Sequence, residues 1–198
     1  GMFVFSPDSF LAKAFPYFKW SVFGLLGVNM ALFFINQTAV EGLESLAWLV
    51  LLMLFEWETS QLDKPYISSL ERYSIHAGRI LAYILILYSA YAYTTLEYIN
   101  ENGRTDMYNA ITWLLIVFLL EYDVYFPGSY AKWEWHLRNT LKIILYTTLF
   151  VIAVWWWIDG EFFDFYDAVL WIVCFFFIEL NVFIFEEEIT HAENRSEV

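Results

Sequence analysis

The sequence predicts an all-α integral membrane protein with six transmembrane helices, arranged as three repeated helical hairpins with an approximate internal threefold repeat. Composition is the first basis for this prediction. The chain of 198 residues is 60% hydrophobic and 22% aromatic, which is far above the values of a soluble domain of this size. Its apolar runs also approach the roughly 20 residues that a helix needs to cross a bilayer core of about 30 Å.

The second basis is a pattern that occurs three times. Each copy has a tryptophan, an apolar run, a glutamate eight residues after the tryptophan, and another polar residue two positions later. The copies start at Trp48, Trp113 and Trp171 and read WLVLLMLFEWE, WLLIVFLLEYD and WIVCFFFIELN. Their spacings of 65 and 58 residues indicate three copies of one structural unit.

The expected helices follow from the apolar runs, taken in order. They cover residues 17–35, 42–57, 75–98, 108–125, 140–158 and 167–185. Each run is apolar on all sides, whereas a helix of a soluble bundle carries a single apolar stripe. Successive pairs then form one transmembrane domain at 17–185, with hairpin repeats at 17–58, 75–125 and 134–185.

Both ends of the chain are expected outside the bilayer. Residues 1–16 are predicted to be a cytoplasmic amphipathic segment that lies on the membrane surface. Residues 186–198 begin with three glutamates and are predicted to be a cytoplasmic polar tail.

The basic residues indicate the orientation. If six helices alternate in direction, nine of the ten Lys and Arg residues fall on one side, and Arg104 is alone on the other. Because cytoplasmic loops are enriched in Lys and Arg, both termini are expected in the cytoplasm. The corresponding localisation is a bacterial inner membrane.

The repeated carboxylates are the candidate functional groups. At a rise of about 1.5 Å per residue, Glu121 and Glu179 lie roughly 9–10 Å inside their helix ends, and Glu56 is shallower. An ionisable side chain inside a span is costly and is a functional candidate by default. The oxygen donors suit protons or hard cations such as Ca²⁺, Mg²⁺ and Mn²⁺. The predicted cation-binding residues are Glu56, Glu58, Glu121, Asp123, Glu179 and Asn181, with Glu56, Glu121 and Glu179 as the metal ligands.

Basic residues at the same depth leave the role of these carboxylates open. They are His76, Arg79, His136, Arg138 and Lys142. In one interpretation they form ion pairs with the glutamates, which either fix helix packing or gate a cation site. In another they hold an anionic phospholipid headgroup at the cytoplasmic face.

The predicted function is a channel or transporter-like protein whose intramembrane carboxylate ring, on the cytoplasmic side, binds a divalent metal ion or a proton. The alternative is a non-catalytic membrane scaffold, or a subunit of a larger complex, in which the ion pairs are structural. Phosphate-loop, zinc-protease and serine-hydrolase motifs are absent from the sequence, so an enzyme that acts on lipid is only a third alternative, behind the other two. Expected partners are the lipid bilayer and a second copy or another membrane protein, and not nucleic acid. The tryptophans are expected in belts at the membrane interfaces.

Overall fold

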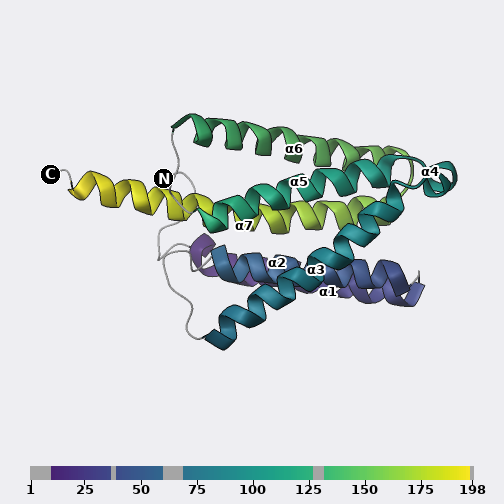
Figure 1. The fold of residues 1–198 in the computed structure, drawn as a ribbon, viewed down its shortest axis with the longest axis horizontal. Coiled ribbons are helices and arrows are strands. Elements are labelled where there is room, and N and C mark those ends of the chain that lie inside the picture. Colours follow the sequence, from purple (N-terminus) through teal and green to yellow (C-terminus); the bar gives the residue numbers. More distant parts are fainter. Residues whose placement is uncertain (1–9, 37–38, 60–68, 127–131, 197–198) are drawn as a thin grey trace.

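The computed structural model describes residues 10–36, 39–59, 69–126 and 132–196, and all regular structure within these ranges is α-helical (Figure 1). The elements are α1 (Phe10–Asn36), α2 (Ala39–Thr59), α3 (Ser69–Tyr93), α4 (Leu96–Asn102), α5 (Thr105–Tyr125), α6 (Lys132–Ile158) and α7 (Phe162–Ser196). This confirms the all-α prediction.

Five of the described helices are long and apolar enough to cross a membrane. The spans are Ala14–Asn36, Ser69–Tyr93, Thr105–Tyr125, Lys132–Ile158 and Phe162–Glu186. Only 22–33% of each apolar window is buried inside the protein, so most of its apolar surface faces outward. Apolar surface of that extent is expected against lipid and not against water. The chain is therefore an all-α membrane protein.

The second predicted span, residues 42–57, corresponds to α2 but is not one of these five. Helix α2 has 21 residues and contains four glutamates. It therefore carries too many charged residues to count as a candidate span by composition. It nevertheless lies inside the bundle, in contact with α1, α3 and α7. The charges of its glutamates therefore need partners on the neighbouring helices.

Helix boundaries differ from the prediction mainly at the polar ends. The third span was expected to continue to Tyr98, but α3 ends at Tyr93 and a separate short helix follows. At this break the side chains of Thr94 and Thr95 donate hydrogen bonds of 2.7 and 2.9 Å to the carbonyl oxygens of Tyr91 and Ala92. Such bonds compete with helix continuation.

The two ends of the chain are more helical than expected. Helix α1 is continuous from Phe10, so the second half of the predicted amphipathic segment leads directly into the first span. Residues 1–9 lie outside the described part. Helix α7 extends to Ser196, which places most of the predicted polar tail in the same helix as the last span.

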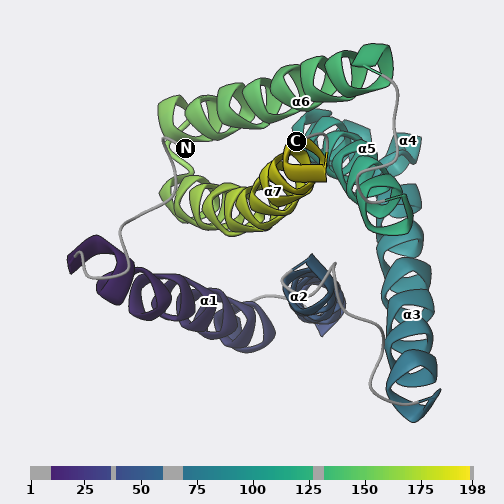
Figure 2. The same ribbon diagram turned by 90° about the vertical axis from the view of Figure 1, so that its left-hand side faces the viewer.

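The six long helices form a closed ring in chain order. Contacts join α1 to α2, α2 to α3, α3 to α5, α5 to α6, α6 to α7, and α7 back to α1. An end-on view shows this order, with α7 and α2 toward the middle (Figure 2). Helices α1, α3 and α6 begin at the end of the bundle where α2 and α5 finish (Figure 1), which we call the terminal end.

The centre of the ring is packed with apolar side chains. Helices α2, α5 and α7 supply fully buried residues, namely Leu51, Leu52, Phe55, Ile116, Val117, Leu120, Cys174, Phe175 and Ile178. Because lipid is as apolar as these side chains, van der Waals packing and not water exclusion holds the helices together.

The three repeated tryptophans belong to this core. The ring of Phe175 lies 6.5 Å from Trp48, 4.8 Å from Trp113 and 6.3 Å from Trp171, measured between centroids. The predicted interfacial position is therefore wrong for these three residues. On α2 the reason is helical periodicity, because Trp48 shares the inward face with the residues three, four and seven positions later.

Candidate functional site

The predicted carboxylates lie at the terminal end of the bundle, each against a basic residue. Lys19 of α1 forms an ion pair with Glu56 of α2. The other oxygen of Glu56 accepts a hydrogen bond of 3.0 Å from the Asn181 amide of α7. The same amide lies 3.2 Å from the hydroxyl oxygen of Thr59. These contacts join the first, second and last helices.

Arg79 of α3 serves two carboxylates. Its Nη2 lies 2.5 Å from Oε1 of Glu58 on α2, and its Nε lies 2.9 Å from Oε1 of Glu121 on α5. The same oxygen of Glu121 accepts a hydrogen bond of 2.7 Å from the hydroxyl of Tyr83. Arg79 therefore links α2, α3 and α5.

Lys142 of α6 makes the corresponding link between the next helices. Its Nζ lies 2.5 Å from Oδ2 of Asp123 on α5 and 2.6 Å from Oε2 of Glu179 on α7. The hydroxyl of Tyr146 donates a hydrogen bond of 3.0 Å to the other oxygen of Glu179. Asp123 is completely buried, so its charge depends on these partners.

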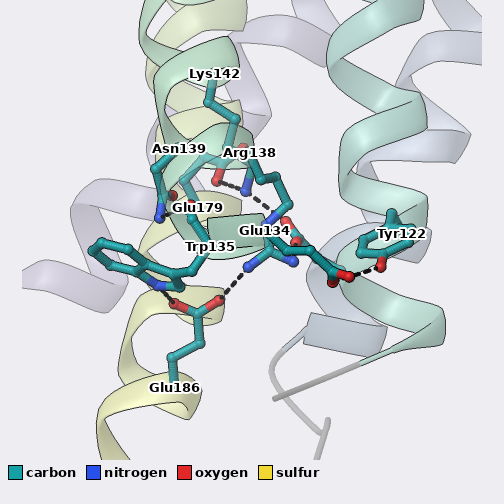
Figure 3. A network of polar contacts seen from close by, with 9 residues as sticks. Tyr122, Glu134, Trp135, Arg138, Asn139, Lys142, Glu179 and Glu186 are labelled. Carbon is teal, nitrogen blue, oxygen red and sulfur yellow. Dashed lines mark hydrogen bonds and ion pairs between the residues drawn. The ribbon is translucent and has the colours of Figure 1, made fainter. Parts of the chain in front are cut away.

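Arg138 extends the network along α6 (Figure 3). Its guanidinium lies 2.6 Å from Oδ1 of Asp123 and 3.2 Å from Oε1 of Glu186 on α7. The indole of Trp135 donates a hydrogen bond of 3.3 Å to the second oxygen of Glu186. Figure 3 shows Arg138 and Lys142 on one face of α6, reaching toward the neighbouring helices.

These contacts have a common order. In each Glu-x-(Glu/Asp/Asn) pair, the first residue contacts a basic side chain of the long helix that comes before it in the chain, which is α1, α3 or α6. The second acid contacts a base near the start of the long helix that follows it, as Glu58 does with Arg79 and Asp123 with Lys142. Residues two apart on a helix point about 200° from each other, which explains why the two members have different partners.

Sequence reasoning did not identify two tyrosines in the network. Tyr83 and Tyr146 each follow a basic residue by four positions and contact the same glutamate as that residue. The available signal was a basic residue followed by an aromatic residue at this spacing, which places both on one helix face. It occurs at Lys19–Phe23, Arg79–Tyr83 and Lys142–Tyr146. In the first copy phenylalanine has no hydroxyl, and Asn181 supplies the additional hydrogen bond.

The structure separates the three proposed metal ligands. Glu56, Glu121 and Glu179 are each bound to a different basic residue. Within the described residues, no group of three or more His, Cys, Asp or Glu side chains is arranged to hold a metal ion. Of the two predicted histidines, His136 is exposed and packs against Trp135, and His76 is half-buried one turn before Arg79.

The network has more acids than bases. In the described part of the chain, these ion pairs connect four basic side chains with six carboxylates, and none of the ten is more than 18% exposed. If all ten groups are ionised, the set has a net charge of about −2. Uncompensated charge is costly in a site of low dielectric constant.

A second set of polar contacts occupies the opposite end. The amide of Asn29 on α1 donates a hydrogen bond of 3.0 Å to Asp167 on α7, and the hydroxyl of Tyr93 on α3 donates one to Glu44 on α2. Asn29 is buried although it lies inside a candidate span. The repeated sequence pattern does not include these residues, so the two contacts are an addition to the candidate site.

No protein-family model, curated protein or solved structure matches this chain. The function is therefore argued from the chemistry of the network itself, since a helical membrane fold by itself is compatible with many activities.

Proposed function

We propose that the protein is a channel or transporter-like membrane protein whose carboxylate network, on the cytoplasmic side, binds a cation, and that this cation is a proton. The observation that carries the proposal is the excess of carboxylates over bases within a buried network. Ion pairs that served packing alone would be stable with equal numbers of acids and bases. An excess calls for positive charge taken from solution.

The separation of the acids favours protons over a divalent metal. A hard metal ion needs several oxygen ligands converging on one point, whereas the glutamates of this network are distributed over three basic residues. A proton needs a single oxygen. Tyr83 and Tyr146 add hydroxyls that can donate to a carboxylate or accept from a carboxylic acid.

The proposal includes a threefold internal repeat and a defined orientation. Recurrence of the acid–base–aromatic arrangement in each hairpin supports three copies of one unit around the aromatic core. The excess of basic residues at the terminal end supports a cytoplasmic location for that end, in a bacterial inner membrane. Transport would require that the packed centre open, and alternation between paired and open states is the expected mechanism.

A scaffold function is the second candidate, and one observation favours it. Each ion pair joins different helices, and together the pairs link all six long helices. A non-catalytic subunit would use these links to fix helix order and to present its outer surface to a partner protein, a second copy or anionic lipid. The two functions share the same contacts and differ in whether ions move.

Ion flux into proteoliposomes tests the proposal. Purified protein is reconstituted with a pH-sensitive dye inside the vesicles, and H⁺ uptake is compared with uptake of Na⁺, K⁺, Mg²⁺, Ca²⁺ and Mn²⁺. The test variant is Glu121→Gln/Glu179→Gln, and Glu134→Gln on the same end of the bundle is the matched control. Circular dichroism confirms that each variant is folded.

The two functions predict different results. Proton flux that is lost in the double variant but kept in Glu134→Gln supports the transport function. If a divalent metal ion is transported instead, and its flux is lost in the double variant but kept in Glu134→Gln, the transported cation is that metal ion and not a proton. No flux of any ion, together with lower thermal stability of the double variant, would establish the scaffold function instead.

A further inference from the structure

The contacts of Arg79 identify one place in the network where a proton is needed. Two carboxylates, Glu58 and Glu121, share this single guanidinium. Their side chains are only 4% and 14% exposed. The second oxygen of each, Oε2, is buried and has no hydrogen-bond partner. Two buried carboxylate oxygens are thus left unsatisfied beside one base.

This arrangement is unfavourable if both acids are ionised. A buried polar atom without a partner costs about 1–3 kcal/mol, and more when it belongs to a charged group. Two carboxylates that share a site also repel one another, so one of them takes up a proton more readily. A proton on either Oε2 leaves one carboxylate against one guanidinium, which is a neutral set.

We propose that Glu58 and Glu121 hold one proton between them, in the membrane-embedded part of the protein, and that this pair is the proton-binding site of the network. The two acids titrate as a coupled pair, so the proton belongs to the pair and not to one residue.

The groups around the pair are consistent with this assignment. On α3, Arg79 and Tyr83 face it, and Tyr125 of α5 lies within electrostatic range of Arg79. On the other side of α2, Lys19 and Asn181 contact Glu56 and not Glu58. Arg79 is the basic side chain that contacts both acids of the pair.

The other two parts of the network differ from this one. Lys19 pairs with a single acid, and the neighbouring Asn181 is neutral. Lys142 also contacts two acids, but Arg138 lies 2.6 Å from one of them and adds a second positive charge. Arg138 contacts one further acid, Glu186, whose second oxygen accepts a hydrogen bond from Trp135. The combination of two acids and one base, with two unsatisfied buried oxygens, occurs at Arg79.

The role of this proton in transport rests on the proposed function, but its presence can be measured without any flux. Infrared spectroscopy of the protein in lipid nanodiscs detects the carbonyl band of a protonated carboxylic acid, which shifts when H₂O is replaced by D₂O. The band is recorded at neutral pH for the wild type and for Glu58→Gln and Glu121→Gln. In each variant the remaining acid has Arg79 to itself and is expected to be ionised.

The inference predicts that either glutamine variant loses the band of one carboxylic acid, and that the control Glu134→Gln keeps it. A band unchanged in either variant would overturn the inference. If a glutamine variant does not fold, Glu58→Asp and Glu121→Asp keep the acid, and each is expected to shift the band instead of removing it; an unshifted band in both would again overturn it.

The infrared experiment tests the shared proton and the flux experiment tests the transport function, so either claim can be contradicted without the other. A shared proton without ion flux keeps this inference and removes the transport function. Proton flux without the predicted change in the band keeps the transport function and places its proton on other residues.

Discussion

The amide of Asn181 lies 3.0 Å from the carboxylate of Glu56, although 125 residues separate them in the chain. This contact joins the last helix to the second one and closes the polar network around the ring. Asn181 occupies the position that Glu58 and Asp123 occupy in the other two repeats. An amide is suited to it because it donates a hydrogen bond, which a carboxylate cannot do.

Asn181→Asp is therefore expected to destabilise the protein. The variant loses the donor to Glu56 and places a second negative charge beside it, so we expect the free energy of unfolding to fall by about 1–3 kcal/mol. Thermal unfolding in detergent, followed by circular dichroism, measures the change. Asn100→Asp makes the same substitution at an exposed position of α4 and is expected to have little effect; equal stability of both variants would contradict the importance of the contact.

Removal of Lys142 is expected to cost more than removal of both members of its pair. Lys142→Met leaves Glu179 without a base, and loss of one partner of a buried ion pair costs about 3–5 kcal/mol. Lys142→Met/Glu179→Gln should recover part of that loss, because the orphaned charge is gone. Chemical unfolding of the single and double variants measures the difference. Lys132→Met, at an exposed position at the start of α6, is the matched control.

The hydroxyl of Tyr83 is expected to stabilise the Glu121 contact. Tyr83→Phe removes the 2.7 Å hydrogen bond and keeps the ring, so we expect a loss of about 1 kcal/mol, in line with hydrogen bonds between membrane helices. The control is Tyr88→Phe on the same helix, where the side chain is 69% exposed. A difference in thermal unfolding between the two variants that is too small to measure would count against a role for the hydroxyl.

The aromatic core gives a prediction that opposes the one from sequence alone. Trp113→Ala removes the ring nearest to Phe175, at 4.8 Å, and leaves a cavity that should lower the free energy of unfolding by about 3–5 kcal/mol. Trp155→Ala removes a ring that is 58% exposed and is expected to cost much less. If these tryptophans were interfacial anchors, the two variants would be similarly affected.

The comparison of sequence with structure shows which features local pattern can predict. Helix class and the pairing of the carboxylates with Arg79, Arg138 and Lys142 were predictable, because apolar length and side-chain depth are local properties of each run. The inward direction of Trp113 was not, since a span that is apolar on all sides carries little signal for the face that turns inward. The hydrogen bond from Asn181 to Glu56 was not predictable either, because it depends on how the ring of helices closes.

The last prediction concerns α2, whose composition excludes it from the five candidate spans. Its length of 21 residues equals that of α5, and its final turns contact the start of α3 through Glu58 and Arg79. If α2 crosses the membrane, the starts of α1, α3 and α6 all lie on the same side of it. If it does not, the start of α3 lies on the opposite side from the start of α1.

Cysteine labelling on intact cells distinguishes these topologies. In a Cys174→Ala background, which removes the buried native thiol, a membrane-impermeant maleimide should label Asn100→Cys and Glu161→Cys directly. It should label Ser69→Cys and Lys132→Cys only after the cells are permeabilised, because those positions start helices at the terminal end. Labelling of Ser69→Cys but not of Phe10→Cys on intact cells would show that α2 does not span the membrane, because the starts of α3 and α1 would then lie on opposite sides. The ion pairs of the network require the opposite result, since Lys19 near the start of α1 could not reach Glu56 near the end of α2 if those two helix ends lay on opposite sides of the membrane.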